Sequence, residues 1–242
     1  MTNKIYSKIS LIYDHLMKDI NYSDWADYLF DIQKQYGNGG KDALEIAAGT
    51  CKLSAFMIKH FPNLFISDLS LQMLLINQFA SNRFCCDMTS LPIKKHFDFI
   101  YSAFDSINYL LNKNMLKKYF LEADRILKPD GILTFDASLE LNSLRNIHAL
   151  NRFGNVNGFR YIQKSQYNNQ TKLHINYFEL SENGSNIYKE KHVQKVFPLE
   201  TYFEIIDKTN MFVVECFDSF SFLDANQESE RVQFIIKKKK NA

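Results

Sequence analysis

The chain lacks the marks of a metal-binding, disulfide-rich or membrane protein. Its four cysteines show no C-x-x-C spacing, so the sequence indicates neither a zinc site nor a disulfide framework. No run of about 18 apolar residues occurs, and residues 1–10 lack the basic segment and long apolar stretch of a secretion signal. We therefore expect a cytoplasmic protein with no bound metal and no membrane partner.

Charge of one sign is not in excess either. The 29 basic and 27 acidic side chains leave a net charge of +2, whereas a nucleic-acid partner requires a clustered basic face. The one dense basic run, residues 237–240, is interpreted as the solvated end of a last strand, with a phosphate or membrane contact as the alternative. With 46% hydrophobic residues, 242 residues can bury one large core, so we expect one enzyme-sized domain without a nucleic-acid partner.

Glycine is scarce at the point where a dinucleotide-binding loop needs it. Such a loop follows a strand and reads G-x-G-x-x-G, but here the three positions hold Ala47, Gly49 and Lys52. This disfavours a hydride-transferring enzyme. The richest glycine cluster, residues 37–40, precedes the strand, and we interpret it as a linker turn.

Residues 42–68 nevertheless have the pattern of a nucleoside-binding βα unit. An apolar strand ends in the small residues Ala47, Ala48 and Gly49, and an amphipathic helix follows, which brings backbone amides close to a ligand. A second apolar strand then ends at Asp68, where doubly wound folds have a ribose-binding carboxylate. The pattern predicts a cofactor that carries a ribose.

Helices and strands alternate over the first part of the chain. The predicted elements are helices 6–17 and 21–36, strand 42–47, helix 52–61, strand 64–67, helix 70–79, strands 83–86 and 97–102, helix 113–127, a turn at 128–131 and strand 132–136. Ser23 and Asp24 are candidate caps of the second helix, and Ser70 is a natural cap of the helix that it opens. This alternation is typical of a parallel sheet covered on both faces.

After Asn155 the pattern changes to a period of two. Segments 156–167, 172–180 and 187–197, with turn signals at 168–170 and 183–184, predict an antiparallel meander, and helix 199–209 and paired strands 212–217 and 231–236 complete the chain. We therefore divide the chain into a core of residues 1–152 and 198–242 and an insertion of residues 153–197.

Five ordered segments carry a resemblance to a known family. They are Leu44, Glu45, Ala47, Gly49 and Thr50; Asp68, Leu69, Ser70, Met73 and Leu74; Asp87 and Met88; Phe97 to Tyr109; and Leu127 to Gly131. Together they resemble the motifs of the class I S-adenosylmethionine-dependent methyltransferases, of the small bacterial kind with an antiparallel lid. The resemblance implies an α/β fold: a Rossmann-like, doubly wound, mostly parallel sheet with an antiparallel last strand, and the insertion as a substrate lid.

The resemblance also implies S-adenosyl-L-methionine as the cofactor and roles for individual residues. Asp68 would accept hydrogen bonds from both ribose hydroxyls, with a helix cap as its alternative role. Asp87 would receive the adenine amino group while Met88 packs on the ring, with a turn residue as the alternative for Asp87. Glu45 is expected to meet loop amides, because an unpaired carboxylate in an apolar strand is costly. The cofactor-binding set is Tyr13, Glu45, Ala47, Gly49, Thr50, Asp68, Leu69, Met73, Asp87, Met88, Ser102 and Phe104.

Candidate catalytic residues lie in three segments. The methyl-transfer site is expected at the carboxyl edge of the fourth strand, among Ser102, Phe104, Asp105, Asn108 and Tyr109. Asp105 is a general base or a helix cap, and Tyr13 covers the sulfonium or packs in the core. His192 is a catalytic base or an exposed histidine of a strand.

Two features of the sequence bear on affinity and on the acceptor. Cys51 stands where the family has the last glycine of its first motif, and a side chain there would point near the methionine end of the cofactor. Aromatic residues are frequent in the insertion, and part of them should cover the carboxyl edge of the main sheet and form the acceptor pocket. They are Phe159, Tyr161, Tyr167, Tyr177, Phe178 and Tyr188.

The sequence thus predicts a methyltransferase for a small-molecule acceptor, acting as a monomer or homodimer. The alternative is a protein of the same fold that binds S-adenosylmethionine without catalytic activity. No D-P-P-Y or N-P-P-Y motif occurs because the four prolines are never adjacent, which disfavours transfer to a nucleobase amino group. Whether oxygen, nitrogen or carbon is methylated stays open.

Overall fold

A seven-stranded, mostly parallel sheet forms the centre of the molecule. The computed structural model describes residues 5–77, 82–182, 184 and 186–240. Strand order is β10-β11-β5-β4-β1-β2-β3, for β1 (Asp42–Ile46), β2 (Asn63–Asp68), β3 (Arg83–Cys85), β4 (Phe97–Ser102), β5 (Leu127–Ser138), β10 (Met211–Asp218) and β11 (Arg231–Lys238). β1 to β5 are parallel, and β11 is antiparallel to both β5 and β10. The predicted doubly wound sheet with an antiparallel last strand is confirmed.

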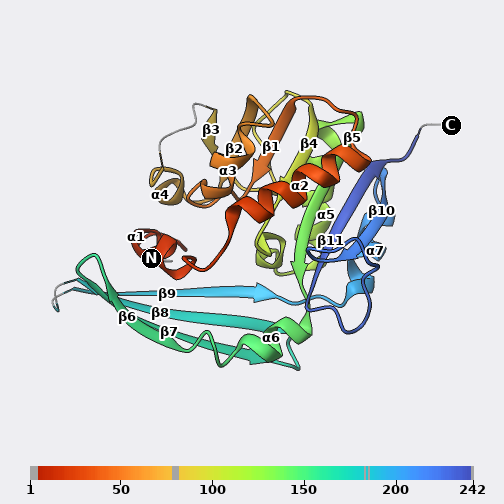
Figure 1. The fold of residues 1–242 in the computed structure, drawn as a ribbon. Helices are drawn as coiled ribbons and strands as arrows, with labels where there is room; N and C mark the ends of the chain where they lie inside the picture. The colour runs from red at the N-terminus through yellow and green to blue at the C-terminus, as the bar shows by residue number, and fades with distance from the viewer. Residues whose placement is uncertain (1–4, 78–81, 183, 185, 241–242) are drawn as a thin grey trace.

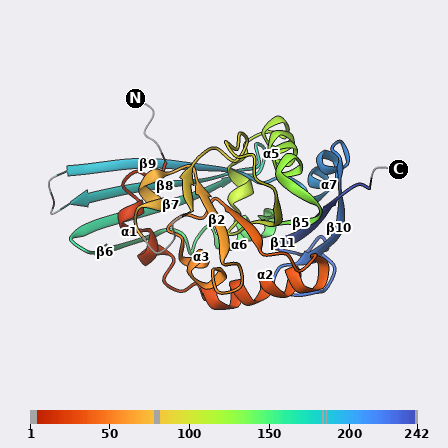
Figure 2. The same cartoon turned by 90° about the horizontal axis from the view of Figure 1, so that it is seen from above.

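Helices cover both faces of this sheet (Figure 2). α2 (Tyr22–Tyr36) and α3 (Lys52–Met57) lie on one face, and α5 (Lys113–Ile126) and α7 (Leu199–Asp207) lie on the other. Adjacent strand residues point to opposite layers: Ala43 packs with the α2 layer, whereas Leu44 packs with the α5 layer, and both are fully buried. Two-sided burial is the reason why these strands read as continuous apolar runs.

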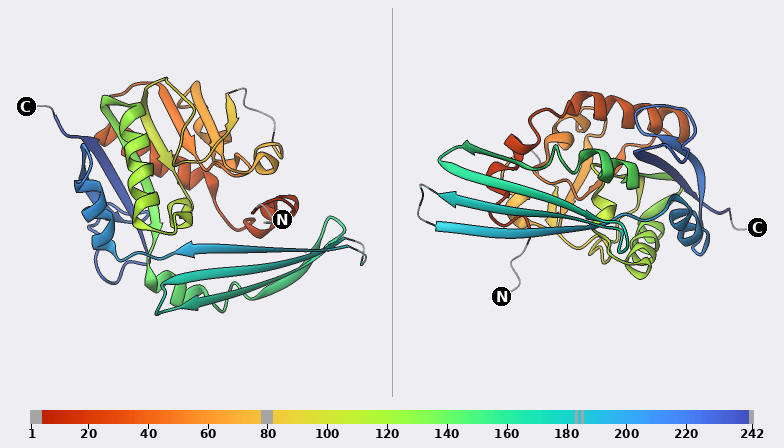
Figure 3. Two further views of the ribbon diagram at one scale, coloured as in Figure 1. Left: turned by 180° about the vertical axis from the view of Figure 1, so that it is seen from behind. Right: turned by 90° about the horizontal axis from the view of Figure 1, so that it is seen from below.

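A second, antiparallel sheet lies across the carboxyl ends of the parallel strands (Figures 1 and 3). It comprises β6 (Arg152–Val156), β7 (Phe159–Asn168), β8 (Leu173–Glu182) and β9 (Asn186–Lys195), and α6 (Glu140–Asn146) connects it to β5. We call these four strands the lid sheet. Between it and the main sheet lies α1 (Ser10–Leu16), whose buried Ile12 and Leu16 pack on Tyr161, Phe178 and Leu180 of the lid sheet.

Several predicted helix boundaries are wrong. The cap of α2 is Asn21, whose side chain accepts a hydrogen bond from the Ser23 N–H, so Ser23 and Asp24 lie within the first turn. Three predicted helices are shorter, because α1 begins at Ser10, α3 ends at Met57 and α4 covers only Leu71–Leu74. Phe79, the predicted end of that last helix, lies outside the described residues. Ser70 caps α4 as predicted, since its side chain accepts from the Met73 N–H.

The inserted segment also differs in detail from the prediction. Segment 156–167 is two strands, because Asn157 and Gly158 both have positive φ and form a turn between β6 and β7. Helix α6 was not predicted. The turn expected at 128–131 lies within β5 as an irregularity, since Leu127 pairs with Phe97 but Ile132 pairs with Phe99. Asn183, part of one predicted turn, lies outside the described residues.

No helix in the described ranges is long and apolar enough to span a bilayer.

Candidate active site

A cavity of about 350 Å³ opens at the carboxyl ends of β1 to β4, within the range of about 300–1,000 Å³ that small-molecule sites occupy. The strand order reverses between β1 and β4, which is where open α/β sheets bind ligands. Loops after the strands form one side, and α1 with the segment before it lines the other. The lining includes Tyr6, Tyr13, Tyr22, Ala47, Gly49, Thr50, Lys52, Asp68, Leu69, Met73, Asp87, Met88, Phe104 and Tyr109.

The loop after β1 has a left-handed backbone at every second residue. The φ angle is +58° at Ala47, +58° at Gly49 and +62° at Cys51. A residue with a Cβ pays about 1 kcal/mol in this region, and glycine does not. A Cβ at Gly49 would lie 3.3 Å from Met73 Cε and 3.9 Å from Tyr13 Cε1. The missing side chain therefore leaves the space between these two residues open to a ligand.

Side chains from three elements hold this loop. The Gly49 N–H donates to Asp68 Oδ2 at 2.8 Å, and Asn77 Nδ2 donates to the Thr50 carbonyl at 2.6 Å. The Thr50 hydroxyl donates to Asp14 Oδ1 of α1 at 2.6 Å. The loop is thus fixed from below by the end of β2 and from above by α1.

Asp68 presents a half-buried carboxylate to the cavity. Its Oδ1 accepts from the Ser70 N–H at 2.7 Å and its Oδ2 from Gly49, yet burial raises the pKa of Asp68 above its usual value despite these bonds. Asp68 does not cap α4, because Ser70 does. A carboxylate has about four acceptor sites, so Asp68 keeps acceptor capacity for ligand hydroxyls.

Asp87 both forms a turn and lines the cavity. Its Oδ1 accepts from the N–H and from the hydroxyl of Thr89, at 2.7 and 2.8 Å. Met88 lines the cavity beside it. The turn interpretation and the binding interpretation of Asp87 are therefore compatible, and its role toward adenine stays a prediction.

Glu45 does not meet the loop amides, and that expectation is wrong. Its carboxylate is buried beneath the loop, where Ser54 Oγ donates to Oε2 at 2.5 Å and the Tyr101 hydroxyl donates to the same oxygen at 3.0 Å. Burial raises the pKa of Glu45 to about 7, against the lowering effect of these two hydrogen bonds. Glu45 supports the fold under the site and does not line the cavity.

Cys51 also points away from the cavity, contrary to expectation. Its side chain is fully buried in the layer of α2 and α3, and Sγ lies 3.8 Å from the Gly49 carbonyl. The departure from glycine therefore affects the backbone of the loop rather than the space for the ligand.

Tyrosines surround the middle of the cavity. The ring of Tyr13 meets that of Tyr6 edge to face, with centroids 5.5 Å apart, and burial raises the pKa of both hydroxyls well above the usual value. Tyr22 also lines the cavity, and its ring centroid lies 5.5 Å from that of Phe104. Neutral aromatic rings beside a cavity can attract a cationic group such as a sulfonium.

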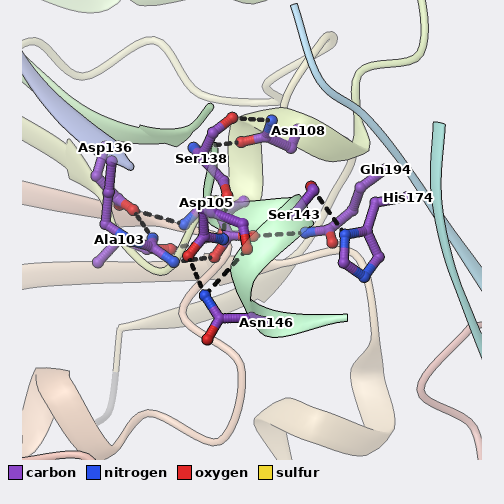
Figure 4. Close-up of polar contacts among 12 residues, drawn as sticks. Ala103, Asp105, Asn108, Asp136, Ser138, Ser143, Asn146, His174 and Gln194 are labelled. Atoms are coloured by element: carbon purple, nitrogen blue, oxygen red, sulfur yellow. Dashed lines mark hydrogen bonds and ion pairs between the residues drawn. The ribbon is translucent and has the colours of Figure 1, made fainter. Parts of the chain in front are cut away.

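Asp105 lies outside the cavity, in an ion-pair cluster that joins the two sheets (Figure 4). Arg231 Nη2 pairs with Asp105 Oδ1 at 2.9 Å, Gln194 Nε2 of the lid sheet donates to Oδ2 at 2.8 Å, and Arg231 also pairs with buried Asp136. Asp105 precedes the 3-10 helix Ser106–Tyr109, but its side chain makes no cap hydrogen bond. With both oxygens engaged, its carboxylate serves to join the sheets.

Ser102 and Asn108 are likewise structural in this arrangement. Ser102 is buried with its Oγ 3.4 Å from the Tyr119 hydroxyl. Asn108 donates to the carbonyls of Ser138 and Lys195 and accepts from the Ser138 N–H, so it ties the 3-10 helix to β5 and β9 (Figure 4). Of the five residues expected at the transfer site, Phe104 and Tyr109 line the cavity.

His192 is not an exposed strand residue, because only 2% of it is accessible. Its Nδ1 lies 3.2 Å from the Tyr109 hydroxyl, and its Nε2 lies 3.2 Å from Glu190 Oε2. His192 thus stands behind Tyr109 rather than in the cavity itself.

The aromatic residues of the lid sheet do not line the cavity, so that expectation is wrong. Tyr161 and Phe178 pack on α1, and the Tyr188 ring lies under the Lys8 ammonium at 4.6 Å. The lid sheet instead contributes positions 191 and 193 of β9. Part of the aromatic surface of the lid sheet, Tyr161 and Phe178, is therefore buried against α1.

Sequence reasoning missed several residues of the site, among them Tyr6, Asp14, Tyr22 and Asn77. The signal for the first three is their position before β1, in segments that the sequence predicts as helices, although Tyr6 itself precedes α1 in the structure. Nothing in the spacing indicated Asn77.

The residues present fit S-adenosylmethionine. Asp68 and Asp87 offer acceptors for ribose hydroxyls and an adenine amine, and Leu69, Met73 and Met88 offer apolar walls. The space beside Gly49 that a Cβ would fill opens toward Tyr13. Within the described residues no group of three or more His, Cys, Asp or Glu side chains could hold a metal ion.

Comparisons with known proteins agree with this geometry. Residues 44–135 match the family model described as a methyltransferase domain. A protein of Geobacillus sp. (strain WCH70), named as a methyltransferase by inference, is 26% identical over 96% of this chain and 99% of its own length.

Two solved structures share the fold over nearly the whole chain. An S-adenosylmethionine-dependent methyltransferase from Clostridium acetobutylicum has a TM-score of 0.80 at 24% identity, covering 98% of this chain and 100% of that one. The sugar N-methyltransferase KedS8 from Streptoalloteichus sp. has a TM-score of 0.78 at 16% identity, covering 99% and 96%. Residues 44–135 thus match a methyltransferase domain, and the whole chain has the fold of S-adenosylmethionine-dependent methyltransferases.

Proposed function

We propose that this protein transfers the methyl group of S-adenosylmethionine to a small-molecule acceptor inside the cavity at the carboxyl edge of the main sheet. The observation that carries the proposal is the cover over this edge: α1 packs between the loop after β1 and the lid sheet. An acceptor must fit the part of about 350 Å³ that the cofactor leaves free. This favours a small molecule over a folded protein or a duplex.

The cofactor supplies an electrophilic methyl group on a sulfonium when bound. The chain's own residues align the reactants. Asp68 would hold the ribose hydroxyls, Asp87 would hold the adenine amine, and Tyr13 would lie near the sulfonium. Methyl transfer gains most from alignment and from exclusion of water, and α1 and the lid sheet supply both by covering the site.

Asp105 has no part in this proposal as a general base. Arg231 and Gln194 engage its two oxygens, and the carboxylate is not among the cavity-lining groups. The Asp105 backbone N–H donates to Asp136 Oδ2 at 2.8 Å, and Asp105 belongs to the junction of the two sheets.

An acceptor screen tests the proposal. S-adenosylmethionine with a radioactive methyl group is incubated with the protein and with two fractions of a bacterial extract, small metabolites and macromolecules. Amino sugars are added as pure candidates, because the similarly folded KedS8 is named a sugar N-methyltransferase. We expect label in a small molecule, and none with Asp68→Ala. Label found only in the macromolecular fraction would contradict the small-molecule acceptor, and cofactor binding without any transfer would favour a binding protein.

A further inference from the structure

A continuous chain of hydrogen bonds runs from the cavity into the lid sheet. Tyr6 and Tyr109 both line the cavity, and their hydroxyls lie 2.6 Å apart. The Tyr109 hydroxyl lies 3.2 Å from His192 Nδ1, and His192 Nε2 lies 3.2 Å from Glu190 Oε2. His192 and Glu190 are 2% and 5% exposed, so water does not compete for these bonds.

At the end of this hydrogen-bonded series that is farthest from the cavity, Glu190 is held as an ionised carboxylate. Glu190 Oε1 accepts from the Ser7 hydroxyl and from the backbone N–H groups of Lys8 and Ile9, at 3.0, 2.6 and 3.1 Å. Burial raises the pKa of Glu190, but the hydrogen bonds from His192 and from these donors outweigh it and hold the pKa below the usual value. An ionised carboxylate only accepts hydrogen bonds.

That acceptor sets the direction of every other bond. Because Glu190 Oε2 accepts, His192 carries its proton on Nε2, and its Nδ1 is left as an acceptor. Tyr109 must then donate its hydroxyl proton to Nδ1, and Tyr6 must donate to the Tyr109 oxygen. The Tyr6 oxygen keeps its lone pairs, which can accept a proton from a group in the cavity.

Aromatic rings lie against the histidine of this hydrogen-bonded series. His192 is flanked by the rings of Tyr6 and Phe178, with centroids 4.4 and 5.0 Å away. The charges that act on the two tyrosines come from Asp105 and Asp68, which raise the pKa of both hydroxyls together with the dominant effect of burial. Both tyrosines are therefore neutral and can pass a proton without losing their own charge state.

We propose that Tyr6, Tyr109, His192 and Glu190 form a relay that removes the proton of the methyl acceptor, which is accordingly a hydroxyl or an amine. This rests on the methyl-transfer function proposed above. The acceptor atom forms its bond to the methyl carbon, and the carbon–sulfur bond breaks with its electron pair going to sulfur. The acceptor proton passes to the Tyr6 oxygen, the Tyr6 proton to Tyr109, and the Tyr109 proton to His192 Nδ1. The resulting imidazolium is paired with Glu190.

Tyr6 and Tyr109 are catalytic residues in this scheme, because they border the reacting groups. His192 acts through Tyr109, and Glu190 acts through His192 by fixing its tautomer. Glu190 also anchors the segment before α1, so a change at Glu190 would disturb the cover of the site as well as the relay. The sharper variant is Tyr109→Phe, which cuts the relay and leaves the Glu190 anchor intact.

The first test needs no acceptor. Nitrogen-15 NMR of the histidine rings, assigned with His192→Gln, should show His192 protonated on Nε2 in the presence of S-adenosylhomocysteine. Tyr109→Phe should shift the Nδ1 signal of His192. The control Tyr161→Phe removes a similar contact, 3.4 Å from His15 Nε2 and away from the cavity, and should leave His192 unchanged. A proton found on Nδ1 would overturn the relay, because His192 could then not accept from Tyr109.

The second test uses the acceptor found in the screen. Tyr109→Phe should lower kcat by about 100-fold at neutral pH, as expected for lost general-base catalysis, with the affinity for S-adenosylhomocysteine and KM little changed. Full kcat in Tyr109→Phe would overturn the relay. Failure of wild-type protein to bind the cofactor, or to methylate anything, would instead count against the proposed function.

Discussion

At the scale of single residues, Glu45 shows how a family motif can serve the fold instead of the ligand. Its carboxyl group is buried under the loop, with Ser54 and Tyr101 as donors, and burial raises its pKa to about 7. The sequence could predict that a carboxylate in an apolar strand needs a partner. It could not predict which one, because Tyr101 comes from a strand 56 positions away.

The raised pKa predicts how stability depends on pH. The folded state favours protonated Glu45, so this group's contribution is complete below about pH 4.5 and is lost as the pH rises through about 7. This difference in the pKa of Glu45 between the unfolded and the folded state corresponds to about 3 kcal/mol of folding free energy. Glu45→Gln, which mimics the protonated form, should therefore gain stability over wild type as the pH rises from 5 to 8. Urea unfolding of both proteins at each pH measures their free energies of unfolding. A difference between the two proteins that does not change with pH would contradict the raised pKa of Glu45.

Cys51 allows a matched test of backbone strain in the loop. Cys51→Ala and Cys51→Gly both remove the buried sulfur, but only glycine accepts the φ of +62° without steric cost. Cys51→Gly should be about 1 kcal/mol more stable than Cys51→Ala. Cofactor affinity should equal that of wild type or exceed it, because the side chain points away from the cavity. Denaturant unfolding orders the two variants, and an alanine variant as stable as the glycine one would show that the loop carries no such strain.

At the scale of elements, α1 is part of the cofactor site although it precedes the first strand. Asp14 accepts from Thr50 and lies 3.4 Å from the Lys52 ammonium, so α1 fixes the loop from above. Asp14→Ala should weaken the binding of S-adenosylhomocysteine by about 1 kcal/mol, which is about fivefold. Asp31→Ala, which removes an exposed ion pair with Lys34 on α2, is the control and should bind normally. Equal affinities in calorimetry would mean that α1 only covers the site.

Most strands could be predicted because their apolar runs are bounded by clear turn residues. β4 was placed to the residue, and β1, β2 and β11 to within two. Helix bounds were less predictable, since α1 begins only at Ser10 and α3 already ends at Met57, although Phe61 beyond it is still buried in the core. The Asn157-Gly158 turn was in the sequence as a typical hairpin signal, and it was overlooked inside a segment with a period of two.

At the scale of the whole molecule, the lid sheet is joined to the core through alternate residues of β9. Glu190 holds the segment before α1, His192 contacts Tyr109, and Gln194 donates to Asp105. The period of two in β9 was visible in the sequence, but the partners of its inward face lie between 83 and 183 positions away along the chain. Such pairs follow from tertiary packing, so the sequence could name His192 as a candidate without showing what it contacts.

The central claim is that the cavity binds S-adenosylmethionine through the carboxylate at the end of β2. Isothermal titration of S-adenosylhomocysteine into wild-type protein and into Asp68→Ala tests it most directly, with circular dichroism to confirm that the variant is folded. We predict binding by the wild type and a loss of about 2–4 kcal/mol in the variant, because ribose hydroxyls would be buried without an acceptor and the Gly49 N–H would lose its partner. An unchanged dissociation constant in folded Asp68→Ala would contradict the claim.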